Sequence, residues 1–245
     1  MNIGIHELGH GHPTFIIAEA CSNIMLHLDR LDVFVEAVAN TGADALKVQL
    51  FKAEHFPEAE WESKRKVEFP RNLIGEFANL CHKHNLLWGA SVFDDEAVDL
   101  CVDHEADFLK LATREWKNEP LLRKCLDTKL QLIRSYDWTQ GDFHAGIYGG
   151  VYDNVIHMAC IPQYPAFNFT VPNVYKLDDY PESVLWGWSS HSPDTLDVLL
   201  AVSRGAAVVE KHVRGSFYDY ESGWSLSFDE FKKMVGDIRR VEAMR

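Results

Sequence analysis

Polar and ionisable side chains recur along this chain at the ends of short apolar segments. Lys47 and Lys110 occur within such segments, and hydroxyl groups occupy comparable positions at Ser91, Thr113 and Ser189. Two ammonium groups with several hydroxyl donors can bind a phosphate or carboxylate group. Burying so many polar groups costs stability unless function requires them. The sequence therefore indicates an anion-binding site.

Two histidines, His191 and His212, lie near the ends of the last two apolar segments. A pair of imidazoles can hold a divalent metal and leave positions open for a substrate oxygen and water. A single histidine at a strand end is more often a hydrogen-bonded structural residue, so the metal hypothesis requires that the two meet. Lys47 and Gln49 lie two residues apart and face one side of a regular strand, whereas Lys211 is expected to point away from His212.

These polar residues are separated by a repeating pattern of an apolar strand and an amphipathic helix. Strands are predicted at Thr14–Cys21, Ala45–Leu50, Leu86–Ser91, Phe108–Leu111, Leu130–Arg134, Val155–Cys160, Val184–Trp188 and Ala206–His212. Helices are predicted at Asp29–Asn40, Asn72–His84, Asp94–His104, Glu119–Asp127, Thr195–Arg204 and Phe228–Met244, with weak patterns at Thr139–Tyr148 and Val171–Tyr180. Eight such units indicate an α/β fold, a closed (β/α)8 TIM barrel. The C-terminal ends of its strands would bring the polar residues to one rim.

Residues 1–13 precede the first unit and are predicted to form a short N-terminal β-hairpin. Its strands are expected at Asn2–His6 and Gly9–Pro13, at the end of the barrel opposite the polar rim. We expect one domain over residues 1–245, in which the barrel occupies residues 14–245.

The composition limits the partners. The chain carries 24 lysine and arginine residues against 37 aspartate and glutamate residues, a net charge of −13. This balance argues against nucleic-acid binding, which depends on cationic side chains that neutralise phosphates. No apolar run approaches the roughly 20 residues that span a bilayer, so no membrane association is expected. Five widely spaced cysteines without a C-x-x-C pair indicate reduced thiols in a cytoplasmic protein.

Several sequence blocks also occur in the order found in one enzyme family. GHPTFIIAEACSN, TGADALKVQLFKAE, FLKLATRE, IPQYPA, GWSSHSPDT and GAAVVEKHV resemble blocks of the sialic acid (N-acetylneuraminate, NeuB-like) synthases, from about Gly9 to the C-terminus. The resemblance implies a TIM-barrel enzyme that condenses phosphoenolpyruvate with an aldose, such as an amino sugar, to give a nonulosonic acid and phosphate. It also implies a divalent metal cofactor, Mn2+ with Mg2+ or Co2+ as alternatives, and a homodimer.

Carried over residue by residue, the resemblance implies a role for each matched position. Glu19 corresponds to a catalytic glutamate that orients or activates water, and Lys47 and Lys110 correspond to lysines that grip phosphoenolpyruvate. The remaining matches place Ser91, Thr113 and Ser189 on its phosphate or carboxylate, Gln49, Glu115 and Tyr164 along the sugar site, and His191 and His212 on the metal.

The chain departs from the family pattern at several positions. Residues 23–26 replace a polar N-H-N-G stretch, and Pro162 replaces an asparagine. Arg134 is expected at an S-T-G block, where it either makes a bidentate phosphate contact or blocks the site. The sugar-binding aspartate has only Asp219 or Glu221 as candidates. The resemblance covers the barrel, without the C-terminal antifreeze-like domain of bacterial sialic acid synthases.

Two other functions are open from the sequence alone. Lys47 or Lys110 could form a Schiff base in an aldolase or another lyase, which requires a lysine of lowered pKa in a desolvated site. Alternatively, the departures at residues 23–26, Arg134 and Pro162 could belong to a diverged, non-catalytic barrel that binds a phosphorylated or sugar ligand without turnover.

Overall fold

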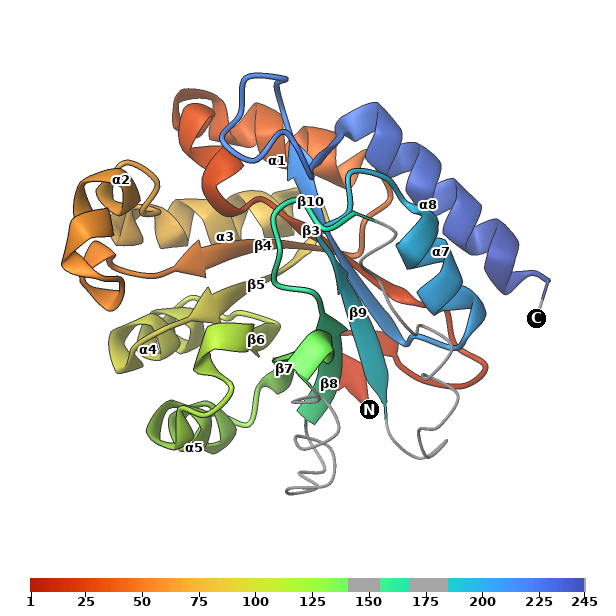
Figure 1. The fold of residues 1–245 in the computed structure, drawn as a ribbon, viewed down its shortest axis with the longest axis horizontal. Coiled ribbons are helices and arrows are strands. Elements are labelled where there is room, and N and C mark those ends of the chain that lie inside the picture. Colours follow the sequence, from red (N-terminus) through yellow and green to blue (C-terminus); the bar gives the residue numbers. More distant parts are fainter. Residues whose placement is uncertain (141–154, 168–184, 245) are drawn as a thin grey trace.

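The computed structural model describes residues 1–140, 155–167 and 185–244. Within these residues, eight parallel strands close into a barrel (Figure 1). In chain order they are β3 (Phe15–Glu19), β4 (Ala45–Leu50), β5 (Leu87–Val92), β6 (Phe108–Leu111), β7 (Gln131–Asp137), β8 (Val155–Cys160), β9 (Trp186–Ser190) and β10 (Val208–Arg214). Each pairs with the next, and β10 pairs with both β9 and β3. The closed pairing confirms the predicted TIM barrel.

The barrel strands are apolar because both of their faces are covered. All residues of β3 and of β8 are buried. Phe15, Ile17 and Phe108, near the starts of their strands, belong to an interior core cluster separate from the larger cluster that includes the helices. This apolar layer fills one end of the barrel, so the polar residues gather at the other end.

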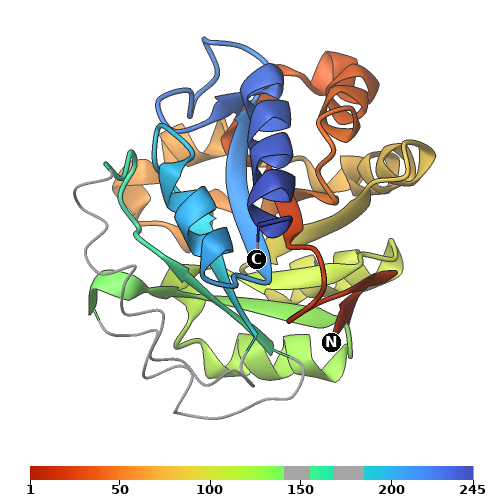
Figure 2. The same cartoon turned by 90° about the vertical axis from the view of Figure 1, so that its right-hand side faces the viewer.

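Helices cover the outside of the barrel. They are α1 (Leu31–Ala39), α2 (Trp61–Arg65), α3 (Ile74–Lys83), α4 (Asp95–Asp103), α5 (Glu119–Asp127), α7 (Leu196–Ser203) and α8 (Phe228–Glu242). Helix α8 begins at the capping box of Ser227 and Glu230, and Figure 2 shows it beside α7. The six helices of clear periodicity are confirmed. The short helix α2 was not predicted, because five residues hold no full apolar repeat.

The N-terminal hairpin is present, but its second strand differs from the prediction. Strand β1 (Asn2–Ile3) pairs in antiparallel register with β2 (His6–Glu7), not with Gly9–Pro13. Gly4 has a φ of +53°, a conformation that glycine adopts without strain, so a tight turn returns the chain at once. Ile3 is buried in the interior core cluster, so the hairpin covers the apolar end of the barrel.

Other expectations differ at their bounds or lie outside the described residues. Strand β7 continues to Asp137, beyond its predicted end at Arg134. A short strand, β11 (Leu226–Ser227), adds to the sheet beside β10. The weak helical patterns at Thr139–Tyr148 and Val171–Tyr180 fall almost entirely outside the described residues. The single domain expected over residues 1–245 stays a prediction.

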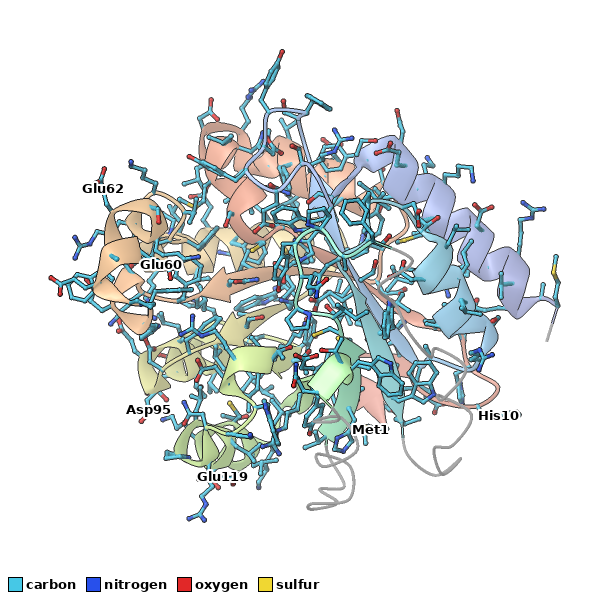
Figure 3. The ribbon with its side chains drawn as sticks, viewed as in Figure 1. Met1, His10, Glu60, Glu62, Asp95 and Glu119 are labelled. Carbon is cyan, nitrogen blue, oxygen red and sulfur yellow. The ribbon has the colours of Figure 1, made fainter. Side chains whose placement is uncertain are left out.

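Charged side chains lie on the outside of the helical layer. Figure 3 shows Glu60, Glu62, Asp95 and Glu119 at the periphery, around α2, α4 and α5. No described helix is both long and apolar enough to cross a membrane. The charged side chains buried inside the barrel are the exception to this outward placement, and they need a functional explanation.

Candidate active site

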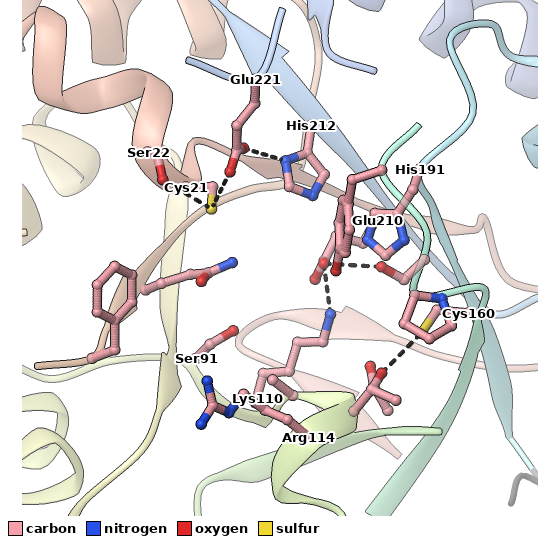
Figure 4. Close-up of a pocket in the computed structure, with 18 of the residues that line it drawn as sticks. Cys21, Ser22, Ser91, Lys110, Arg114, Cys160, His191, Glu210, His212 and Glu221 are labelled. Carbon is pink, nitrogen blue, oxygen red and sulfur yellow. Dashed lines mark hydrogen bonds and ion pairs between the residues drawn. The ribbon is translucent and has the colours of Figure 1, made fainter. Parts of the chain in front are cut away.

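A cavity of about 650 Å3 opens where the barrel strands end (Figure 4). Nine residues singled out in the sequence line it: Lys47, Gln49, Ser91, Lys110, Thr113, Tyr164, Ser189, His191 and His212. They come from five of the barrel strands and from segments that follow a strand. The polar residues therefore converge at the C-terminal rim, where TIM barrels carry their active sites.

Two lysines and two glutamates form a buried charge cluster inside the barrel. Lys47 forms an ion pair with Glu19, its direct partner in the β3–β4 register. It also donates a hydrogen bond of 2.7 Å to Ser91 Oγ. Lys110 donates a hydrogen bond of 2.6 Å to Glu210 Oε1, and Lys47 Nζ lies 3.7 Å from Glu210 Oε2. One carboxylate thus faces both ammonium groups.

Burial sets the protonation of this cluster. It lowers the pKa of the Lys47 ammonium to about 7, against the opposing effect of the Glu210 carboxylate. Burial alone would raise the pKa of Glu210, but the ammonium groups of Lys110 and Lys47 hold it well below its usual range. Near neutral pH, Glu210 is therefore ionised while Lys47 exchanges between its charged and neutral forms. An anion in the cavity would favour the charged form.

Glu210 is a site residue that the sequence did not assign. Besides the bond from Lys110, its Oε1 atom accepts a hydrogen bond of 3.1 Å from Ser189 Oγ. Its Oε2 atom is buried without a hydrogen-bond partner among the described residues. The available signal was its spacing, two residues before the second histidine, which puts both side chains on one face of β10. As expected, Lys211 between them points away and donates to Ser190 Oγ at 3.1 Å.

The two histidines lie side by side, with ring centroids 5.4 Å apart. His191 Nδ1 lies 2.7 Å from the carbonyl oxygen of Ile161 and donates to it, which leaves Nε2 with a free lone pair. His212 Nδ1 lies 2.8 Å from Glu221 Oε2. Burial, and next the His212 ring, lower the pKa of His191 to about 3. Neutral imidazoles whose second nitrogen is hydrogen-bonded are the usual form of histidine metal ligands.

A second group of potential ligands lies beside this pair. One ligand atom each from Cys21, His212 and Glu221 lies within 4.8 Å of the others. Cys21 Sγ is 3.0 Å from Glu221 Oε1, and Figure 4 shows the three side chains directed toward one another. Thiolate, imidazole and carboxylate are all metal ligands, so this group could hold a metal ion.

Two of the predicted site residues, Glu19 and Glu115, lie near the cavity but do not line it. Glu19 is fully buried behind Lys47, where its Oε1 atom accepts a hydrogen bond of 2.7 Å from the Cys21 amide. Glu115 accepts a hydrogen bond of 2.8 Å from the Asn118 side chain. Glu19 therefore reaches the site through Lys47, and Glu115 does not reach it directly.

Aromatic side chains form much of the remaining wall, namely Phe51, Phe56, Phe93, Tyr164 and Trp224. The Tyr164 ring lies 4.3 Å from that of His191 and 5.5 Å from that of Trp224, measured between centroids. Apolar walls with a few convergent polar groups are typical of small-molecule sites.

Comparison with known proteins assigns a family to this barrel. Residues 34–245 match the model of the NeuB family, which is most of the chain. The chain belongs to the NeuB family. It is an enzyme of the sialic acid synthase type, a transferase of carbohydrate biosynthesis.

Individual NeuB-type relatives are distant but cover nearly all of the chain. It is 27% identical to the spore coat polysaccharide biosynthesis protein SpsE of Bacillus subtilis, over 96% of this chain and 69% of that protein. It is 28% identical to the N,N'-diacetyllegionaminic acid synthase of Legionella pneumophila, over 98% of this chain and 76% of that protein. The solved N-acetylneuraminic acid (sialic acid) synthetase of Leptospira borgpetersenii has a TM-score of 0.89 at 24% identity, covers 100% of this chain and 89% of that chain, and shares the fold.

In this NeuB-family barrel, Arg134 does not lie in the cavity, contrary to the expectation. Because β7 continues to Asp137, its alternation places Ser135 on the inner face and Arg134 on the outer face. Ser135 lines the cavity, whereas Arg134 donates to the carbonyl oxygen of Trp116 and lies 3.5 Å from Glu119. The prediction was wrong because it took the strand to end at Arg134. The cavity keeps a hydroxyl at this position and is not blocked.

The segment that replaces the N-H-N-G stretch of the NeuB family is held by its own contacts. Residues Cys21–Leu26 form a short 3-10 helix. The Asn23 side chain is buried. It donates a hydrogen bond of 2.9 Å to the carbonyl oxygen of Val213 and accepts one of 2.8 Å from the Glu221 amide. Asn23 thus fixes the segment that carries Glu221 against the barrel.

The two candidates for the sugar-binding aspartate differ in position. Asp219 is buried outside the cavity lining, where its carboxylate accepts a hydrogen bond of 2.8 Å from the Gly215 amide and lies 3.0 Å from His27 Nε2. Glu221 lines the cavity. Asp219 therefore holds its loop together, and Glu221 is the acid that faces the site.

Proposed function

We propose that this enzyme condenses phosphoenolpyruvate with an aldose, an amino sugar or a related aldehyde, to give a nonulosonic or 2-keto-3-deoxy sugar acid and phosphate. The observation that carries the proposal is the convergence of Lys47 and Lys110 with His191 and His212 in one cavity. Relatives named legionaminic acid, N-acetylneuraminate-9-phosphate and pseudaminic acid synthases support the reaction class. All five cysteines are free thiols without a disulfide, which supports a cytoplasmic location. A homodimer stays a prediction.

In this proposal, phosphoenolpyruvate binds over the lysine cluster. Lys47 and Lys110 supply positive charge, and Ser91, Ser135 and Ser189 supply hydroxyl donors from neighbouring or facing strands. Glu210 holds the Lys110 side chain in place before the ligand arrives, through the bond of 2.6 Å. Thr113 belongs to the same wall, where its hydroxyl lies 2.8 Å from Cys160 Sγ. The aldose then occupies the aromatic part of the cavity, along Gln49 and Tyr164.

The histidines fit a divalent metal such as Mn2+, Mg2+ or Co2+. Two imidazoles on one cation, with metal–nitrogen bonds of about 2.1 Å, have ring centroids roughly 5 Å apart. The observed separation of 5.4 Å is compatible with that value. His191 and His212 would hold the cation through their Nε2 atoms, since each Nδ1 is hydrogen-bonded. The chemistry that such a cation supplies is polarisation of the aldehyde oxygen.

The reaction joins the enol carbon of phosphoenolpyruvate to the aldehyde carbon, using the electron pair of the double bond. The aldehyde oxygen takes a proton and becomes a hydroxyl. Water adds to the electron-poor carbon that carries the phosphate and gives up one proton, which balances the proton taken by the aldehyde oxygen. The hydroxyl left on that carbon then releases its proton to the departing phosphate, so that its oxygen becomes the ketone oxygen while the carbon–oxygen bond breaks and phosphate leaves with the bridging oxygen. Glu210 Oε2 is placed to accept a hydrogen bond from this water and orient it, because it faces the lysine cluster without a hydrogen bond of its own among the described residues.

Phosphate release tests the proposal. The purified enzyme is incubated with phosphoenolpyruvate, Mn2+ and a panel of aldoses, and phosphate is measured beside the mass of the product. We expect phosphate to appear with at least one aldose, in equal amount to the sugar acid, and not without an aldose. Binding of phosphoenolpyruvate without phosphate release from any pair would favour the non-catalytic barrel.

One observation also favours a Schiff-base lyase, namely the pKa of about 7 that burial gives Lys47. Borohydride traps an imine as a stable secondary amine on the lysine. Because the condensation forms no imine, we expect no added mass on Lys47 or Lys110 after borohydride treatment with pyruvate or an aldose. A trapped adduct on either lysine would support the lyase.

A further inference from the structure

The group of Cys21, Glu221 and His212 carries a chemistry that the condensation does not use. We propose that these three residues bind a cation that accepts sulfur ligands, such as Zn2+ or Co2+. A thiolate selects such cations over Mg2+, which prefers oxygen ligands. The site shares His212 with the histidine pair but uses its Nδ1 edge and does not require His191, so it does not rest on the proposed function.

The geometry is close to that of a tetrahedral metal site. Bonds of about 2.3 Å to sulfur and 2.0–2.2 Å to nitrogen and oxygen place the ligand atoms roughly 3.3–3.6 Å apart. In the structure, Cys21 Sγ is 3.0 Å from Glu221 Oε1, Glu221 Oε2 is 2.8 Å from His212 Nδ1, and the three ligand atoms lie within 4.8 Å of one another.

The backbone around Cys21 presents the sulfur to this site. Cys21 has a φ of +41°, in the left-handed region that non-glycine residues seldom adopt. Its amide donates a hydrogen bond of 2.7 Å to Glu19 Oε1, so Glu19 fixes the backbone of Cys21. The sulfur meets the Glu221 carboxylate on the other side, and the Glu221 amide is fixed by Asn23 at 2.8 Å. Two segments about 200 positions apart in the chain are thus held together at the thiol.

Charge also favours a cation. The Glu221 side chain is 14% exposed, and within the described part of the chain its ion-pair partner is the His212 ring. Cation binding would neutralise this partly buried carboxylate. The step needs no oxidant or reductant. The Cys21 thiol loses its proton to solvent, and the His212 proton moves from Nδ1 to Nε2 without net release. This cation and one held by the Nε2 atoms of the histidine pair therefore exclude each other.

Cobalt absorption tests the site, because a thiolate bound to Co2+ gives a charge-transfer band in the near ultraviolet. The full chain is freed of metal with a chelator and titrated with Co2+, and Zn2+ affinity is measured by competition with a chromophoric chelator. We expect the band in the wild type and its loss in Cys21→Ser, with Zn2+ affinity lower by about 100-fold or more. His191→Gln should keep the band.

Cys160→Ser is the matched control, because Cys160 is a second buried cysteine that lines the cavity. It should keep both the band and the Zn2+ affinity. Cys21→Gly suits the left-handed φ and replaces Cys21→Ser if serine disturbs folding. A band that persists in the Cys21 variants, a band lost in Cys160→Ser, or a wild type without a band would overturn the proposal, whatever the outcome of the phosphate assay.

Discussion

Lys110 Nζ lies 2.6 Å from Glu210 Oε1, and this contact crosses the barrel from β6 to β10. The two strands are not neighbours in the sheet, so the pair spans the interior. Lys110 is 5% exposed and Glu210 is 2% exposed. The barrel therefore carries an internal counter-ion for the lysine that is proposed to meet the substrate phosphate or carboxylate.

Replacing Lys110 should weaken both binding and folding. In Lys110→Met, the cavity loses a cation and Glu210 loses its closest partner. We expect kcat/KM for phosphoenolpyruvate to fall by at least about 30-fold, since losing one partner of a buried charge pair costs about 2–5 kcal/mol. The free energy of unfolding in urea should fall by about 3 kcal/mol.

A paired substitution separates the two effects. In Lys110→Met with Glu210→Leu, the carboxylate that lost its closest partner is also gone, so stability should recover in part while activity does not. Lys124→Met, at a half-buried lysine of α5 whose Nζ lies 2.5 Å from Asp99 Oδ1, is the control and should leave activity unchanged. Full activity in Lys110→Met would contradict the placement of phosphoenolpyruvate at this lysine.

The inward residue of β7 should matter more to substrate binding than its outward neighbour. Ser135→Val places a methyl group where a hydroxyl faces the cavity, and we expect KM for phosphoenolpyruvate to rise about tenfold, as for the loss of a hydrogen bond to a charged group. Arg134→Met should leave KM unchanged while lowering stability, because Arg134 contacts Trp116 and Glu119 on the outer side. The opposite pattern would restore Arg134 to the site.

Binding of phosphoenolpyruvate should weaken as the pH rises through about 7. Burial lowers the pKa of Lys47 to about 7, so above this pH the free enzyme loses the charge that the anion needs. Protonating the lysine then costs binding energy, and Kd should rise by up to roughly tenfold per pH unit. Titration calorimetry at a series of pH values around 7 measures this Kd for phosphoenolpyruvate. Lys47→Arg keeps its charge, so its Kd should lack this rise.

The lowered pKa of Lys47 also sets the direction in which the free energy of unfolding changes with pH. Between about 7 and the ordinary lysine pKa, the unfolded chain holds a proton on Lys47 that the folded chain does not. The contribution of Lys47 to the free energy of unfolding therefore grows as the pH rises through this window. Urea unfolding of the wild type and of Lys47→Met should differ in slope there. Parallel curves would contradict the lowered pKa.

Asp219 should prove structural. Asp219→Asn removes a carboxylate that accepts from the Gly215 amide at 2.8 Å and lies beside His27. We expect a loss of about 1–3 kcal/mol in stability and an unchanged KM for the aldose. Glu221→Gln changes the acid that faces the cavity, so it should alter activity. An altered aldose KM in Asp219→Asn alone would reverse the two roles.

Much of the fold could be predicted from the sequence because apolar strands and amphipathic helices alternate with clear caps. The polar strand ends could be placed in one rim for the same reason. Strand ends were less predictable. Strand β7 continues past Arg134, and because successive side chains point to opposite faces, Ser135 and not Arg134 faces the interior of the barrel. The hairpin register depends on Gly4 at φ +53°, which periodicity does not reveal.

The contacts within the site could not be predicted, because they join residues far apart in the chain. Glu210 was visible as a neighbour of His212 on one strand face, but its bond to Lys110 depends on how the barrel closes. The meeting of Cys21 with Glu221 likewise depends on two loops that no local pattern connects.

The fate of the bridging oxygen of phosphoenolpyruvate tests the central claim most directly. The enzyme is supplied with phosphoenolpyruvate that carries a heavy-oxygen label at this position, together with the aldose that supports turnover, and both products are weighed by mass spectrometry. The proposed condensation breaks the carbon–oxygen bond, so the label is expected in the released phosphate. Label retained in the sugar acid or in pyruvate would show cleavage at phosphorus and contradict the mechanism.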